Sequence, residues 1–112
     1  MKYEKRDVGE VTVIDLSGKI TIGSGDEALR DMISAVLDEG KKNLLLNLEF
    51  VKYMDSAGIG ELIRCYTRVK NAGGELKLLN LTKKIKDLLT ITKLISIFED
   101  FTDESEAVKS FT

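Results

Sequence analysis

Hydrophobic and polar positions change period several times along the chain, and these changes divide it into alternating strands and helices. The β-branched run at residues 11–16 is typical of a strand, and a weaker strand is predicted over residues 3–8. Gly9 and Glu10 lie between the two runs and favour a hairpin turn. After the second run, Gly18 permits a turn or a bulge.

The first helix is predicted over about residues 25–39, because apolar residues recur there at helical spacing. Ser24 and Glu27 have the three-residue spacing of a capping box, in which a hydroxyl and a carboxylate satisfy the first backbone N–H groups. Gly23–Gly25 is interpreted as the entry to this helix and not as a phosphate-binding loop, because it lacks the lysine of such a loop. Gly40 is well placed to end the helix in a left-handed conformation.

The middle of the chain predicts a buried strand, a loop, a second helix and another strand. The nearly continuous apolar run at 43–48 is typical of a strand buried on both faces, and residues 49–54 are predicted to be a loop. From residue 57 to about 72 the apolar positions lie on one helical face, and two glycines at 73–74 stop the helix. Residues 75–80 are predicted to be a strand.

The last third predicts two shorter helices. Thr82 is placed to cap the first, residues 95–98 form a short strand or a loop, and Thr102 or Asp103 caps the last. This order of elements predicts an α/β fold with crossover helices, namely a mixed sheet of four to five strands with about four helices. We expect a single domain over residues 1–112.

Composition narrows the classes of function. The chain of 112 residues has a net charge of −2, which argues against nucleic acid and membrane partners because both favour a basic face. It contains one cysteine and no histidine, so it lacks the commonest general base and the commonest metal ligand. We therefore expect no enzyme activity, no cofactor and no metal. The single cysteine and the absence of a signal peptide favour a cytoplasmic location.

The motif with the most specific chemistry is the segment 55–60, Asp-Ser-Ala-Gly-Ile-Gly, at the predicted start of the second helix. Ser56 is either a helix N-cap or a phosphoacceptor, because a helix start favours both a capping oxygen and a phosphate. Asp55 either orients the Ser56 hydroxyl or interacts with the helix dipole. Gly58 and Gly60 indicate tight packing against the sheet or close approach of a partner. Cys65 has no histidine to activate it, so a catalytic role is not expected.

The same motif, preceded by a Leu-rich strand, resembles the signature of STAS domains, and more narrowly that of the stand-alone anti-sigma factor antagonists of bacteria. The resemblance covers nearly the whole chain and includes residues 13–20, 73–78, 97–98 and 106–108. It implies a binding module whose unphosphorylated form binds an anti-sigma factor that is also a serine kinase, thereby releasing a sigma factor. The kinase phosphorylates the serine after the aspartate, here Ser56, and a metal-dependent serine phosphatase restores the active form.

The resemblance also implies a partner-binding surface, whose members here are Thr21, Ser24, Asp55, Ser56, Ala57, Gly58, Ile59 and Gly60. Family members often have a second hydroxyl beside the acceptor, but Ala57 leaves Ser56 as the only one in this motif. Many antagonists carry an acid where this chain has Thr21, so the partner itself stays open. The alternative is a STAS module that regulates a transport or signalling complex without a phosphoswitch. The sequence does not determine the oligomeric state.

Overall fold

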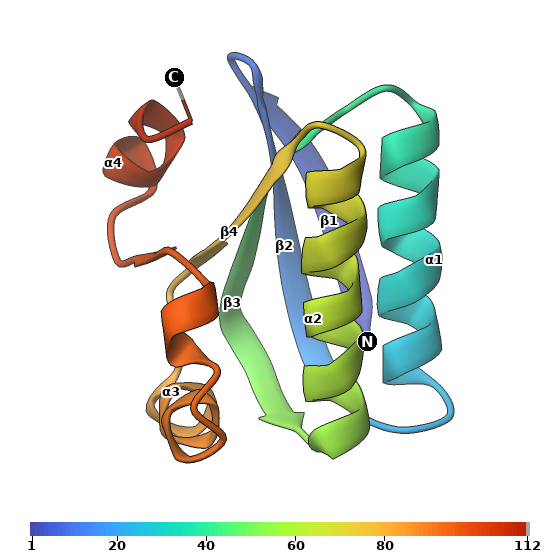
Figure 1. Ribbon diagram of the computed structural model, residues 1–112, viewed down its shortest axis with the longest axis vertical. Helices are drawn as coiled ribbons and strands as arrows, with labels where there is room; N and C mark the ends of the chain where they lie inside the picture. Colours follow the sequence, from blue (N-terminus) through green and yellow to red (C-terminus); the bar gives the residue numbers. More distant parts are fainter. Residues whose placement is uncertain (112) are drawn as a thin grey trace.

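Five strands form one mixed sheet in the order β1-β2-β3-β4-β5 in the computed structural model, which describes residues 1–111 (Figure 1). Strand β1 pairs with β2 in the antiparallel sense, and each later pair of neighbours is parallel. The predicted α/β class with a mixed sheet is confirmed. The strands are β1 (Lys2–Val8), β2 (Val11–Ile20), β3 (Asn43–Met54), β4 (Glu75–Leu79) and β5 (Asp100–Phe101).

Helices cover both faces of the sheet, as parallel strands require. The two long helices lie side by side on one face, and the short last helix lies on the other (Figure 1). The third helix lies at the end of the sheet where β3 finishes. The helices are α1 (Gly25–Asp38), α2 (Ser56–Asn71), α3 (Lys83–Ile91) and α4 (Glu104–Lys109), with a 3₁₀ turn at Ile95–Ile97.

The main core lies between the sheet and the two long helices, and its residues come from every second position of the regular parts of the strands. Ile14, Leu46 and Leu78 are fully buried there beneath Leu29 and Leu62. A smaller core under α4 is built on Val11, Val13, Leu45, Leu79 and Ala107. The central strand β3 therefore buries both of its faces, as its apolar run predicts.

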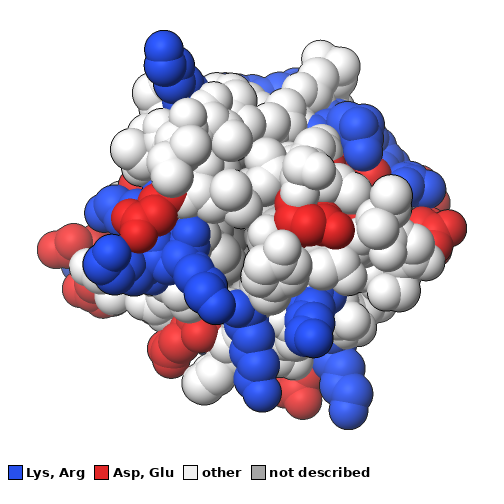
Figure 2. All heavy atoms as spheres, turned by 90° about the horizontal axis from the view of Figure 1, so that it is seen from below, with Lys and Arg blue, Asp and Glu red and all other residues white. Residues whose placement is uncertain are grey.

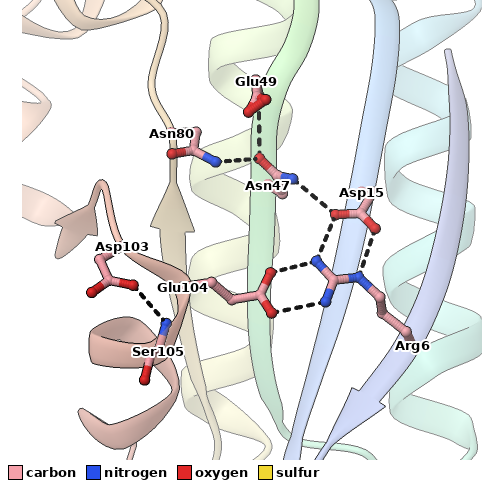
Figure 3. Close-up of polar contacts among 8 residues, drawn as sticks. All are labelled: Arg6, Asp15, Asn47, Glu49, Asn80, Asp103, Glu104 and Ser105. Atoms are coloured by element: carbon pink, nitrogen blue, oxygen red, sulfur yellow. Dashed lines mark hydrogen bonds and ion pairs between the residues drawn. The ribbon is translucent and has the colours of Figure 1, made fainter.

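A polar network crosses the face of the sheet that α4 covers in part (Figure 3). The Arg6 guanidinium donates to Asp15 Oδ2 at 2.8 Å and to Glu104 Oε2 at 2.8 Å, so it links β1, β2 and α4. The Asn47 amide donates to Asp15 Oδ1 at 2.9 Å and accepts from Asn80 at 3.2 Å. Arg6 lowers the pKa of both carboxyl groups by hydrogen bonding to them, and the Asn47 amide adds to the shift at Asp15.

Several predicted boundaries are confirmed. Thr82 and Asp103 cap their helices by accepting the N–H groups of Ile85 and Ser105. Gly40 follows α1 with a φ of 83°, and Gly18 forms a bulge inside β2 with a φ of 92°.

The loop predicted at 49–54 is wrong, because this segment continues β3 along the second half of β2. Phe50 pairs with Ser17 and Met54 pairs with Ile20, with register shifts between Asp15 and Ser17 and after Gly18. The shifts disturb the alternation of inward and outward side chains, which explains why the pattern resembles a loop.

One further prediction near a helix end is wrong, and one of two alternatives is excluded. The capping box at Ser24 does not form, since Asp26 Oδ1 accepts the N–H groups of Gly23 and Glu27 and the Ser24 side chain makes no cap bond. Of the two alternatives for residues 95–98, the short strand is excluded, because the segment holds a 3₁₀ turn within the connection and the last strand begins only at Asp100.

Candidate functional site

The helices α1 and α2 both begin against the carboxyl end of β2, and glycines make this contact sterically feasible. A Cβ atom at Gly58 would lie 2.1 Å from the Ile20 carbonyl oxygen and 2.7 Å from Met54 Cγ. A Cβ atom at Gly25 would lie 2.5 Å from the Lys19 carbonyl oxygen. Gly58 therefore serves packing inside the fold, which decides between its two interpretations.

Asp55 is the N-cap of α2 and also holds the neighbouring loop in place. Its Oδ1 accepts the N–H of Gly58 at 2.9 Å, and its Oδ2 accepts the N–H of Ile22 at 3.0 Å. These backbone hydrogen bonds, first from Ile22 and then from Gly58, lower the pKa of the Asp55 carboxyl. The carboxylate thus ties the loop that follows β2 to the start of α2. The interpretation of Ser56 as the N-cap is wrong, because Asp55 fills that role.

Ser56 is the first residue of α2, and its side chain is exposed. Its hydroxyl has no hydrogen-bond partner among residues 1–111. Asp55 therefore does not orient the hydroxyl, since its two oxygens accept backbone N–H groups instead. A free hydroxyl beside the first N–H groups of a 16-residue helix is accessible to an enzyme and compatible with a phosphate.

The structure brings most of the expected partner-binding residues to one end of the molecule. Ser24 is exposed. Thr21, in the loop that Asp55 holds, and Ala57, next to Ser56, are half-buried. Gly58 and Ile59 are buried within the fold, so they support this surface from below.

Gly60 is half-buried, and the space where its Cβ atom would lie is open. The nearest atoms to a Cβ there are the Arg64 guanidinium nitrogens at 3.7 Å. Packing inside the chain therefore does not require a glycine at position 60, in contrast to position 58.

Three surface residues at this end are not among those predicted from the sequence. Ile22 has an exposed fraction of 75%, and it lies in the loop bound by Asp55. Tyr53 and Lys84 line a hollow of about 420 Å³ beside Ser56, together with Met54, Asp55, Ile85 and Leu88. The missed signal is that Ile22 and Tyr53 are large apolar residues outside any amphipathic period. Figure 2 views this end and shows an uncharged area beside clustered Lys and Arg side chains.

A buried carboxylate joins α1 to α2 behind the site. Glu61 has an exposed fraction of 1%, and its Oε1 accepts from Arg30 Nε at 3.1 Å and Arg64 Nε at 3.4 Å. Burial first, and the Glu61 charge second, raise the pKa of Cys65 to about 12. A protonated, buried thiol is a poor nucleophile, which agrees with the expectation that Cys65 has no catalytic role.

Within residues 1–111, no group of three or more His, Cys, Asp or Glu side chains has an arrangement that could hold a metal ion. In the same range, no helix has the length and apolar character needed to cross a membrane.

Comparison with known proteins identifies the class to which this fold and site belong. The model of the STAS domain family matches residues 2–107, and the chain belongs to this family. The anti-sigma-B factor antagonist of Bacillus subtilis is 34% identical over 86 residues, which are 77% of each chain.

Solved structures agree with this assignment. The Bacillus cell fate determinant SpoIIAA in its phosphorylated form is 25% identical, with a TM-score of 0.73 over 99% of this chain and 100% of that one. An anti-sigma factor antagonist from Mycobacterium paratuberculosis has the same fold, with 21% identity and a TM-score of 0.81 over 98% of this chain and 92% of that one.

Proposed function

We propose that the chain is an anti-sigma factor antagonist controlled by phosphorylation of Ser56. In the unphosphorylated form it binds an anti-sigma factor that is also a serine kinase, and so frees a sigma factor. Phosphorylation of Ser56 by that kinase ends the interaction, and a serine phosphatase reverses the modification. The protein acts as a binding module in the cytoplasm and performs no chemistry of its own. Residues 1–112 form one STAS domain, of which residue 112 lies outside the described part.

The observation that carries this proposal is the exposed hydroxyl of Ser56, which has no partner within residues 1–111, at the start of a long helix whose N-cap is already Asp55. The relatives named antagonists of anti-sigma factors, and the phosphorylated form of SpoIIAA, support the same assignment. Because Asp55 supplies the cap, a change at Ser56 leaves the helix start intact. The hydroxyl is therefore available for regulation without a cost to folding.

A phosphate adds about −1.5 to −2 charges at neutral pH. The helix N-terminus tolerates this charge, since the first N–H groups and the helix dipole are positive there. A partner packed closely on Ser56 does not tolerate it, and an interfacial penalty of about 3 kcal/mol lowers affinity by roughly 100-fold. The switch therefore acts on the interface and leaves the fold unchanged.

The test compares two serine-to-aspartate variants that place the same charge in the first turn of different helices. Ser56→Asp changes the proposed site, whereas Ser105→Asp changes an exposed serine in α4, whose N-cap is likewise an aspartate. Binding to the kinase-type anti-sigma factor, captured from the source organism with the wild-type chain, is measured by calorimetry. We expect Ser56→Asp to abolish binding with a native circular dichroism spectrum, and Ser105→Asp to bind like wild type.

The second test measures phosphate on the chain by mass spectrometry, after incubation with the same kinase and ATP. We expect one phosphate on the wild-type chain and none on Ser56→Ala. Equal binding of Ser56→Asp and wild type refutes the switch. An unmodified Ser56 favours the alternative, a STAS module that binds its complex without a phosphoswitch.

A further inference from the structure

A second open surface lies next to the Ser56 hollow, at the carboxyl end of β3. It is a groove of about 880 Å³, which we call the β3 groove and define by Lys19, Phe50, Lys52, Thr82 and Lys84 among its lining residues. Lys84 lines both the β3 groove and the Ser56 hollow, so the two surfaces are continuous. The expected partner-binding residues include none of the residues that define the groove.

Two aromatic rings stand exposed along the strand that forms the groove. Phe50 has an exposed fraction of 63%, and Tyr53, at the boundary with the Ser56 hollow, has one of 48%. They pair with Ser17 and Lys19 on β2, beyond the half of the sheet that α4 covers. Exposed aromatic side chains surrounded by polar ones are typical anchors of protein interfaces.

The charge of the groove is positive although the whole chain carries −2. Lys19, Lys52 and Lys84 line it, against the single carboxylate of Glu49. Within residues 1–111 none of these three amines is engaged in an ion pair, whereas neighbouring Lys83 pairs with Asp87 at 3.0 Å. Figure 2 shows Lys and Arg side chains on the side of this end where α3 lies in Figure 1, with others along the lower edge and at the upper right of the view.

We propose that the β3 groove is a second docking surface, which binds an acidic segment of a partner protein that also carries an apolar side chain. The three lysines attract the acidic residues, and the Phe50 ring packs against the apolar one. A membrane or a nucleic acid fits less well, because the groove offers only three lysines on a chain whose net charge is −2. The proposal concerns the unphosphorylated chain and does not rest on the proposed switch at Ser56.

The test uses the unphosphorylated chain alone and follows its amide signals by ¹⁵N NMR during titration with the peptide acetyl-DDELFEDE-amide. One control peptide has lysine in place of every acid, and a second keeps the acids but replaces Leu and Phe with Ser and Gly. We expect the acidic apolar peptide to shift the amides of Phe50, Lys52 and Lys84, with an affinity that falls as salt is raised. Both control peptides are expected to bind at least 10-fold more weakly.

Matched variants locate the site. Lys84→Glu and Phe50→Ala are expected to weaken peptide binding at least 10-fold, whereas Lys70→Glu, an exposed lysine at the far end of α2, changes it less than twofold. The dispersed NMR spectrum of each variant verifies its fold. The proposal is overturned if the peptide shifts no groove amide at 2 mM, if the lysine peptide binds equally well, or if Lys70→Glu has the same effect as Lys84→Glu. Binding of a uridine 10-mer or of phosphatidylserine vesicles in place of the peptide overturns it as well.

Discussion

Gly58 and Gly60 lie two residues apart in α2, yet the structure predicts opposite effects when each is replaced by alanine. The added Cβ atom of Gly58→Ala would lie 2.1 Å from the carbonyl oxygen of Ile20. That oxygen belongs to the backbone of β2, so relief requires the start of α2 to move by more than about 1 Å, since ordinary contacts between heavy atoms are about 3.5 Å. In Gly60→Ala the nearest atoms, at 3.7 Å, belong to the flexible Arg64 side chain.

The magnitudes follow from two competing effects. Alanine stabilises a helix interior by about 1 kcal/mol relative to glycine. Overpacking of a well-packed contact costs about 1–3 kcal/mol, and occasionally more. We therefore expect Gly60→Ala to raise the free energy of unfolding by about 0.5–1 kcal/mol. Gly58→Ala is expected to lower it by about 1–2 kcal/mol, because the steric cost at that position exceeds the gain in helix propensity.

Urea denaturation, followed by circular dichroism at 222 nm, measures both changes, and equal m-values indicate that a shift of the midpoint reports a change in stability. The two variants control for each other, since both make the same chemical change in the same helix. An unfolding midpoint of Gly58→Ala at or above that of wild type would refute the steric argument. A loss of stability in Gly60→Ala would show that position 60 is also packed.

Three further predictions concern groups away from the Ser56 motif. Cys65 is expected to stay unreacted with a thiol reagent at pH 8 in the native state and to react fully in urea, because burial raises its pKa to about 12. Glu61→Gln is expected to cost about 1–2 kcal/mol in urea denaturation, since it weakens charged hydrogen bonds from Arg30 to a buried group. The lowered pKa values of Asp15 and Glu104 stabilise the fold above their ordinary values of 3.8 and 4.5, and this contribution is lost as the pH falls through the lowered ones. Arg6→Leu should therefore reduce the fall of stability between about pH 5 and pH 2, and an unchanged acid profile would contradict the role of this guanidinium.

The elements that are set by residues close together in the chain can be predicted from the sequence alone. Apolar residues at helical spacing and a glycine after the last turn are local signals, and they predict α1 and α2 closely. The placement of Ser56 at a helix start is local too, because it depends on the strand before it and the periodic residues after it. The sequence therefore locates the candidate phosphoacceptor without reference to the rest of the fold.

Contacts between distant segments are decided only by the tertiary structure. The second half of β3 is a strand because β2 lies beside it. The bulges in this pairing interrupt the alternation of apolar and polar residues by which a strand is predicted. Asp55 becomes the N-cap and the anchor of Ile22, which is 33 residues away in the chain. Glu61 is buried because Arg30 of α1 supplies a counter-charge. In each case part of the energy comes from a partner that the local sequence does not contain, which is the physical reason why the pattern of the chain alone leaves these features open.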